Sequence, residues 1–270
     1  MSETATKFKE FGIKGMVSSE ESEIAEMLRE RNLERVNAES APVQFKNTLY
    51  SRLIKRFIDI AVSLPICIIL LPIYALIAIG TFIDVGKPVV FKQTRVGKDG
   101  EPFNMIKFRS MNNKTDSEGR LLPAAQRLTK FGKFLRKTSL DELPEFWNVL
   151  SGKMSIIGPR PMPTVFVDRM SERHKMRHAV RPGLECPRVF NGNDPQTSAY
   201  YYQFESDIWY VENISLRTDI KMVFMLVKMV FSRKTRAKHA NVASYFVGYD
   251  DEGKAISTKL AMQIYGKTEK

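Results

Sequence analysis

Residues 57–83 read FIDIAVSLPICIILLPIYALIAIGTFI, and this run of apolar residues decides the class of fold. Asp59 is its only charged residue. A run of more than about 18 apolar residues is typical of a segment that enters a bilayer, because the hydrocarbon core is about 30 Å thick. The core helices of soluble proteins are rarely this long and this uniformly apolar. We therefore expect a membrane protein.

Two prolines bear on how this segment sits in the membrane. Pro65 and Pro72 each remove a backbone donor and clash with the preceding turn, and Pro72 lies near the middle of the run. A kink there predicts a helix that returns to the side it entered, although an ordinary spanning helix with a positive flank stays open. Lys55 and Arg56 precede the run at helical spacing from Asp59, so we expect them to anchor the segment and to pair with Asp59 at the interface.

The chain as a whole is basic and contains little cysteine. It has 270 residues and a net charge of +12, which predicts one or two domains and anionic partners such as nucleic acid, lipid head groups or phosphorylated substrates. Cys67 and Cys186 lie far apart, which argues against a disulfide framework or a cysteine-rich zinc site. His174 and His178 have the spacing of zinc ligands on a helix, but a surface pair is the favoured interpretation.

Outside the apolar run the sequence predicts a mainly helical α+β chain. A helix is expected over residues 18–36, in a polar segment that we expect to be solvated and partly disordered rather than docked on a partner or a second copy. Two β-rich runs around the turn at 97–102 predict a hairpin. Residues 129–137 and 220–231 have the pattern of amphipathic helices at a membrane surface, although core packing fits 129–137 nearly as well.

An acidic pair, Asp141 and Glu142, stands at the start of a further helical segment. Pro144 is tolerated only in the first turn of a helix, so a helix beginning near Leu140 or Asp141 is predicted. In the simplest interpretation Ser139 caps this helix and Glu142 completes a capping box. The buried stripe is expected at i, i+3, i+4 and i+7, which are Leu143, Phe146, Trp147 and Leu150.

Two arginines favour a second interpretation of the acidic pair. Arg136 lies five residues before Asp141, and Arg160 lies on a proline-stiffened turn. Guanidinium groups bind phosphate oxygens with two hydrogen bonds at once, and the free N–H groups at a helix N-terminus also favour anions. A carboxylate between two such arginines indicates a diphosphate site, and the membrane segment restricts the substrate to one reached at a bilayer surface.

The motifs between about Arg52 and Phe231 resemble a known family. They are Lys55-Arg56 before the apolar run, FKQTRVG at 91–97, KFRSM at 107–111, LRKTSLDELP at 135–144 and MSIIGPRP at 154–161. In this order they resemble the bacterial sugar transferases called monotopic phosphoglycosyl transferases. The resemblance implies an enzyme at the cytoplasmic face of the bacterial inner membrane. Such an enzyme moves a phosphosugar from a nucleoside-diphosphate sugar, expected to be a UDP-sugar, to polyprenol phosphate and so initiates glycan or exopolysaccharide assembly.

The resemblance also implies structure and residue roles. The membrane helix is expected to be re-entrant and broken at Pro72, and interfacial helices are expected beside it. Asp141 is the expected nucleophile, forming a phosphosugar-aspartyl intermediate, and the expected Mg²⁺ ligand, with Glu142 as its partner acid. Arg136 and Arg160 are expected to hold phosphate oxygens. Three further basic residues either support the phosphate site or are solvated strand positions: Arg95, Lys107 and Arg109.

Four parts of the chain follow from these patterns. They are a polar extension at 1–50, the re-entrant helix at 51–84, the catalytic domain at 85–240 and an appendage, expected to resemble a hairpin, at 241–270.

The sequence departs from the family at two places. Residues 181–192 read RPGLECPRVFNG where the family usually has a TGWAQVNG-like run, which leaves the sugar donor open, and Leu71 stands where a serine usually precedes the proline. A non-catalytic membrane scaffold for polysaccharide assembly is the alternative function. The apolar run argues against a nucleic-acid binder.

Overall fold

The computed structural model describes residues 19–190, 199–231 and 245–266. These ranges are mostly helical, and their strands form three sheets of two strands each, so the predicted α+β class is confirmed. The α-helices are α2 (Ser19–Glu39), α3 (Lys55–Ile69), α4 (Leu71–Val85), α5 (Ala124–Arg127), α6 (Lys130–Thr138), α7 (Glu145–Leu150), α8 (Glu172–Lys175), α9 (Ala199–Glu212), α10 (Leu216–Phe231) and α12 (Thr258–Tyr265). The strands are β1 (Val90–Val96), β2 (Pro102–Phe108), β3 (Ser155–Ile157), β4 (Gly183–Glu185), β5 (Phe246–Tyr249) and β6 (Ala255–Ser257).

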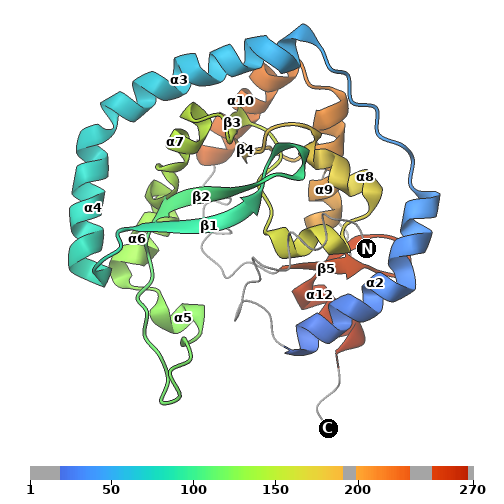
Figure 1. Ribbon diagram of the computed structural model, residues 1–270, viewed down its shortest axis with the longest axis horizontal. Helices are drawn as coiled ribbons and strands as arrows, with labels where there is room; N and C mark the ends of the chain where they lie inside the picture. Colours follow the sequence, from blue (N-terminus) through green and yellow to red (C-terminus); the bar gives the residue numbers. More distant parts are fainter. Residues whose placement is uncertain (1–18, 191–198, 232–244, 267–270) are drawn as a thin grey trace.

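The apolar run forms a bent helix pair, α3 and α4, which curves around one side of the molecule (Figure 1). The bend is 59°, and Pro72 lies in the first turn of α4, where its missing N–H costs no intrahelical hydrogen bond. The predicted break at Pro72 is therefore confirmed. In the described parts of the chain no single helix is long and apolar enough to cross a membrane, whereas this bent pair together meets that length and composition.

The buried side of α3 corrects one prediction. Asp59 does not pair with Lys55 or Arg56 at an interface but is only 2% exposed. Its Oδ1 accepts hydrogen bonds from the hydroxyl of Ser155 and the N–H of Ile156, both at 3.0 Å. The carboxylate thus joins α3 to β3, because a buried carboxylate needs donors and the start of this strand supplies them.

The two basic residues at the start of α3 hold other elements. Lys55 donates to Asp219 on α10 at 2.5 Å. Arg56 donates to the carbonyls of Val149 and Leu150 at the end of α7, at 2.6 and 2.7 Å, where a cation also complements the helix dipole. Both residues therefore bind α3 to the body of the protein.

The predicted hairpin of β1 and β2 is confirmed. The strands are antiparallel, with Val90 opposite Phe108 and Val96 opposite Pro102. The 3-10 turn η2 (Lys98–Gly100) connects them. Phe103 on β2 packs in a cluster with residues of and after α7, whereas the cluster of Phe108 contains residues of α4 and α6. The hairpin therefore lies between the bent helix pair and the centre of the molecule.

Helix α6 is packed into the protein on one side. Leu135 is fully buried and Phe131 packs beside it, in a cluster that includes Ile77 of α4, whereas Phe134 is exposed. Core packing, the open alternative at the sequence level, is therefore confirmed for Leu135 and Phe131. A β-carbon on Gly132 would lie 1.9 Å from the backbone oxygen of Ser110, so only glycine fits this approach.

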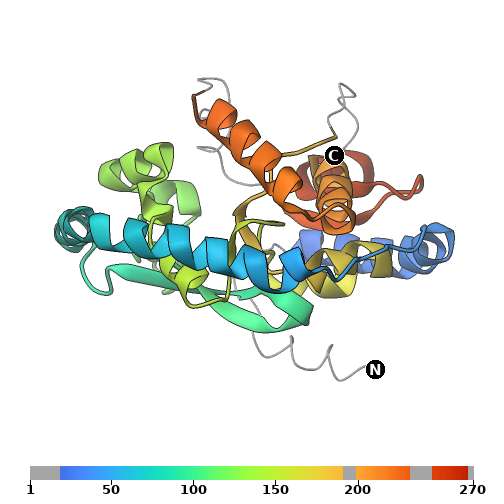
Figure 2. The same cartoon turned by 90° about the horizontal axis from the view of Figure 1, so that it is seen from above.

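Helix α10 presents apolar side chains outward. Figure 2 shows α10 on the opposite side of α3 from the β1–β2 hairpin. Met222 is buried, while the exposed apolar side chains are Leu216, Ile220, Val223, Phe224 and Val227. The pattern agrees with the predicted surface helix, and its contact with lipid stays a prediction.

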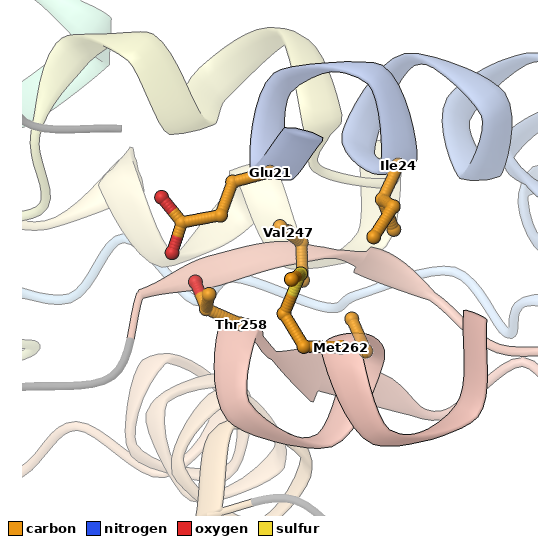
Figure 3. A pocket seen from close by; sticks show the side chains of 6 residues that line it. Glu21, Ile24, Val247, Thr258 and Met262 are labelled. Atoms are coloured by element: carbon orange, nitrogen blue, oxygen red, sulfur yellow. The ribbon is translucent and has the colours of Figure 1, made fainter. Parts of the chain in front are cut away.

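The prediction of a solvated, partly disordered segment before residue 50 is wrong for α2. Ile24 and Leu28 are buried in a cluster with Val247 of β5, and Figure 3 shows Ile24, Val247 and Met262 of α12 facing one another. The side chain of Asn32 also donates to the carbonyl of Tyr249, at 2.9 Å. The predicted hairpin of the appendage is confirmed as β5 and β6, and its apolar surface is what orders α2.

Leu28→Ala should destabilise this docked unit by about 2–5 kcal/mol, because Leu28 is 1% exposed and its truncation leaves a cavity. The measurement is the midpoint of thermal unfolding in a neutral detergent, with limited proteolysis to locate the loosened segment. Met27→Ala is the matched control, since Met27 is 38% exposed, and it should change the midpoint little. Equal effects of the two variants would contradict the docked position of α2.

The histidine pair is not at the surface, so that prediction is wrong. His174 is buried, and its ring nitrogens lie 2.8 Å from the hydroxyl of Tyr249 and 2.9 Å from Glu205. His178 is buried too, and burial lowers its pKa to about 3. The residues described contain no group of three or more ligand side chains suited to a metal.

Candidate active site

The acidic pair lies on a single 3-10 turn, η3 (Leu140–Glu142), between α6 and α7. Ser139 ends α6 in the left-handed conformation, with φ 57°, and its side chain caps nothing. The predicted capping box is therefore wrong, and Pro144 stands at the N-cap of α7. The turn is tied to the bent pair, because the hydroxyl of Tyr74 on α4 donates to the carbonyl of Leu143 at 3.0 Å.

The buried stripe of α7 also differs from the prediction. Trp147 is 41% exposed, whereas Glu145, Asn148 and Val149 are buried. Helix α7 begins at Glu145, and its buried face is the one that packs against β2 with Asn148 and Val149. Asn148 uses that face to accept from the N–H of Ile106 at 3.1 Å and so ties α7 to β2.

Glu142 is held by two cations. Its Oε1 accepts from the Nζ of Lys107 and from the Nη2 of Arg160, both at 2.5 Å. Burial alone would raise the pKa of Glu142, but Arg160 and Lys107 outweigh burial and lower it to about 2. The carboxylate of Glu142 therefore favours its ionised form and forms ion pairs with both cations.

Asp141, the neighbouring residue, has the opposite environment. It is buried and, in the described ranges, forms no ion pair. Burial and the charge of Glu142 raise its pKa, while Lys107 and Arg136 act against that rise. Adjacent carboxyl groups whose pKa values are driven apart are typical of a catalytic site with separate roles for each group.

Sequence reasoning missed Glu145. Its side chain lies at 3.1 Å from Lys107, and burial raises its pKa against the lowering effect of Lys107 and Arg160. The signal that could have found it is the three-residue spacing from Glu142, which places both carboxylates on one side of a helical turn.

The predicted phosphate-binding arginines lie on either side of the acidic pair. Arg136 donates from Nε to the hydroxyl of Ser110 at 3.0 Å. It is also close enough to Asp141 for its charge to oppose the rise in the pKa of that carboxyl group. Arg160 follows β3 and donates from Nη1 to the carbonyl of Leu184 at 2.8 Å. The structure therefore brings Arg136 to Asp141 and Arg160 to Glu142.

The three hairpin candidates have different positions. Lys107 is in the acidic cluster. Arg95 donates to the carbonyl of Pro161 at 3.3 Å, and burial together with nearby Arg160 lowers its pKa to about 10. Arg109 is buried, and its guanidinium group donates to three backbone carbonyls, those of Lys87, Pro88 and Met111. Arg109 is therefore a structural residue of the loop, not a solvated strand position.

Residues 181–192, where the sequence departs from the family pattern, contribute β4 beside the acidic pair and Arg160. Strands β3 and β4 are parallel, with Ile157 beside Glu185. The carboxylate of Glu185 is 3.7 Å from Arg160. This second missed acid follows from a pairing of strands that are 28 residues apart, which no local pattern reveals.

The side chains of this site would suit a Mg²⁺ ion that is held jointly by the protein and by substrate phosphates. The described residues form no cluster of three or more ligand side chains, so they do not make an all-protein metal site. Mg²⁺ commonly uses one or two carboxylates together with substrate phosphates and water. Asp141 is suited to this because Glu142 and Glu145 are already engaged with Lys107.

The chain is similar to known proteins over most of its length. The model of the family described as bacterial sugar transferase matches residues 50–233. The uncharacterized sugar transferase EpsL of Bacillus subtilis (strain 168) is 36% identical over 202 residues, which cover 74% of this chain and 98% of that protein. The UDP-glucose:undecaprenyl-phosphate glucose-1-phosphate transferase of Escherichia coli (strain K12) is 38% identical over 193 residues, 68% of this chain and 41% of that protein.

A third relative is named for a different donor. The UDP-N-acetylgalactosamine-undecaprenyl-phosphate N-acetylgalactosaminephosphotransferase of Aeromonas hydrophila is 35% identical over 185 residues, which cover 66% of this chain and 44% of that protein. The match therefore spans less than half the length of this relative and of the Escherichia coli relative.

Proposed function

The chain belongs to the bacterial sugar transferase family, and we propose that it transfers a sugar phosphate from a UDP-sugar to a polyprenol phosphate. Two relatives carry names of this reaction with different sugars, so the reaction class is the shared property and the sugar is open. The relatives are named as enzymes, which favours a transferase over a scaffold. The observation that carries the proposal is the acidic pair, with Glu142 paired to two cations and Asp141 buried and unpaired among the described residues.

The reaction proceeds in two displacements. A carboxylate oxygen of Asp141 attacks the phosphorus that bears the sugar, and the bond from that phosphorus to the bridging oxygen breaks, so UMP leaves with both electrons of that bond. A phosphate oxygen of polyprenol phosphate then attacks the same phosphorus, and Asp141 departs as a free carboxylate. The product is a polyprenol diphosphate sugar, and each step exchanges one oxygen on phosphorus for another.

The surrounding cations bind and orient the donor. Arg136 and Arg160 donate to the phosphate oxygens and offset the charge that builds up there. Glu142 keeps Lys107 and Arg160 in place, since its two ion pairs fix both side chains. When bound, Mg²⁺ neutralises part of the diphosphate charge, and Asp141 is the residue that would hold it.

The membrane is where the two substrates meet. The outward side chains of the bent pair include Phe57, Ile69, Leu76 and Ile83, all exposed and apolar. We infer a re-entrant segment at 51–84, a catalytic domain at 85–240 on the cytoplasmic face, and flanking parts at 1–50 and 241–270. The 59° bend near Pro72 supports this arrangement, since two short helices that meet at an angle do not form one straight helix across the bilayer.

A donor screen tests the function. Detergent-solubilised protein is incubated with single UDP-sugars, polyprenol phosphate and Mg²⁺, and UMP release is measured. One donor should release UMP, and EDTA should stop the release until Mg²⁺ is restored. If a full donor panel gave no UMP while the protein still bound lipid, the scaffold would replace the transferase.

The pH dependence of UMP release should report Asp141. Its raised pKa predicts that kcat/KM is lost as the pH falls through that value, because the attacking carboxylate must be ionised. Glu142→Gln removes a negative neighbour and frees two cations, so the acid limb should move to lower pH, whatever the loss of rate. An acid limb that stays in place or moves up would contradict the assignment of Asp141.

A further inference from the structure

A cavity of about 160 Å³ lies at the N-terminal end of the apolar helix α3. Its wall combines Arg52, Lys55 and Asp59 from η1 (Tyr50–Ile54) and α3 with Ser155, Arg181 and Lys98 of the hairpin turn. This space is smaller than the pockets of drug-sized ligands, about 300–1,000 Å³, and suits a small charged group. The wall carries four cationic side chains and one carboxylate, so the cavity favours an anion.

Two of these cations have free donors. Arg52 donates from Nε to Asn47 at 2.8 Å, and Arg181 donates from Nε to the carbonyl of Gly152 at 3.1 Å. The terminal nitrogens of both guanidinium groups have no hydrogen-bond or ion-pair partner in the described part of the chain. Lys55 and Lys98 are in contact with Asp219 and Asp99. The unneutralised charge is therefore that of Arg52 and Arg181.

Asp59 adds an acceptor to the same wall. Its Oδ1 is used by Ser155 and Ile156, but its Oδ2 is buried and has no partner among the residues described. A buried carboxylate oxygen without a donor is costly. The ligand that suits this wall therefore carries a hydroxyl or ammonium donor beside its anionic group.

The cavity is distinct from the Asp141 cluster. Ser155 and Arg181 stand at the amino ends of β3 and β4, whereas Arg160 and Glu185 lie at the carboxyl ends. On the hairpin, Lys98 is in the turn and Lys107 is near the open end, roughly 15–20 Å away along the strand. A donor or acceptor reacting at Asp141 therefore does not occupy this cavity.

The outer face of the same helical segment is apolar. Leu49, Leu53 and Phe57 follow one another at four-residue spacing and are all exposed. Arg52, Lys55 and Asp59 line the cavity on the other side. The segment thus offers a cationic pocket beside an apolar surface. A phospholipid matches both, because its head group is anionic and its acyl chains are apolar.

We propose that this cavity binds the head group of an anionic phospholipid, with Arg52 and Arg181 donating to its phosphate and Asp59 accepting from its hydroxyl. The acyl chains lie along Leu49, Leu53 and Phe57. This proposal rests on the membrane association included in the proposed function, but it requires no turnover. The site fixes the depth at which α3 enters the bilayer.

Binding of short-chain phosphatidylglycerol to the full chain in neutral detergent tests the proposal. Native mass spectrometry of a lipid titration gives the affinity, and the shift of the thermal unfolding midpoint gives a second readout. Arg52→Gln/Arg181→Gln should lower the affinity at least tenfold. Lys92→Gln/Lys114→Gln removes the same charge from exposed positions outside the cavity and should change the affinity less than twofold.

Three outcomes would overturn the proposal. The first is equal affinity of wild type and the double cavity variant for phosphatidylglycerol. The second is an equal loss in the control variant, which would mean nonspecific attraction. The third is stabilisation by inorganic phosphate through Arg52 and Arg181 with no effect of phosphatidylglycerol, which would assign the cavity to a soluble phosphate.

A folding defect is separated from loss of the site. If the double variant does not fold, Arg52→Gln alone carries the test, because in the described ranges the guanidinium group of Arg52 donates a hydrogen bond only to the side chain of Asn47. UMP release is measured on the same preparations. If no donor released UMP while lipid binding stayed intact, the proposed reaction would be wrong and the lipid site would still be supported.

Discussion

Asp141→Asn should lower the rate of UMP release at least about a thousandfold, because an amide oxygen cannot form the phosphosugar-aspartyl ester. The substitution keeps the size of the side chain and suits its buried position, so the protein should still fold. UMP release under saturating donor is the measurement. Asp99→Asn is the matched control. Asp99 lies in the hairpin turn with φ 55°, a conformation that asparagine tolerates, so this variant should keep the activity of the wild type.

The same variant should abolish the covalent adduct. Wild-type protein incubated with donor and no polyprenol phosphate should gain the mass of one sugar phosphate on the peptide that contains Asp141. Asp141→Asn should gain none. Product formation by the variant at the wild-type rate, or an adduct on another side chain, would transfer the role of nucleophile away from Asp141.

Asp207→Asn should cost about 3–5 kcal/mol of stability, because it leaves the buried guanidinium of Arg177 without a counter-ion. Arg177 and Asp207 are 1% and 0% exposed at their side chains. Arg177 donates from Nε and Nη2 to the Oδ2 of Asp207 at 3.0 and 2.6 Å. Its Nη2 also donates to the carbonyl of Arg160 at 2.9 Å, so the pair supports the turn that carries Arg160, the proposed phosphate ligand.

The midpoint of chemical unfolding in neutral detergent measures this effect. Arg177→Met/Asp207→Leu should recover much of the loss, since two apolar side chains of similar volume leave no charge buried alone. Asp251→Asn is the control, because its pair with Arg31 is about half exposed and should be worth less than about 1 kcal/mol. A loss for Asp207→Asn as small as that of the control would contradict the buried pair.

Local patterns in the sequence predicted the elements but not their partners. The length of the apolar run, the break at Pro72 and the turn at 97–102 are properties of neighbouring residues, and the structure has all of them. Asp59 was assigned to its neighbours Lys55 and Arg56 on spacing alone. Its partners come from β3, almost 100 residues later, and no periodicity contains that information.

The candidate site shows the same division. Asp141, Glu142 and Arg160 were identified from motifs that lie close together in the chain, and two of these form an ion pair. Lys107 was only a supporting candidate, although it pairs with both Glu142 and Glu145. Its place depends on how the hairpin docks against η3, which is a tertiary contact.

The docking of α2 against β5 has a consequence for the synthesis of the protein. Asn32 and Tyr249, which are hydrogen-bonded, are 217 residues apart along the chain. At about 5–20 residues per second, translation delays this contact by on the order of 10–40 s. During that interval the apolar face of Ile24 and Leu28 has no strand to cover it, so the nascent chain is expected to need a chaperone at helix α2.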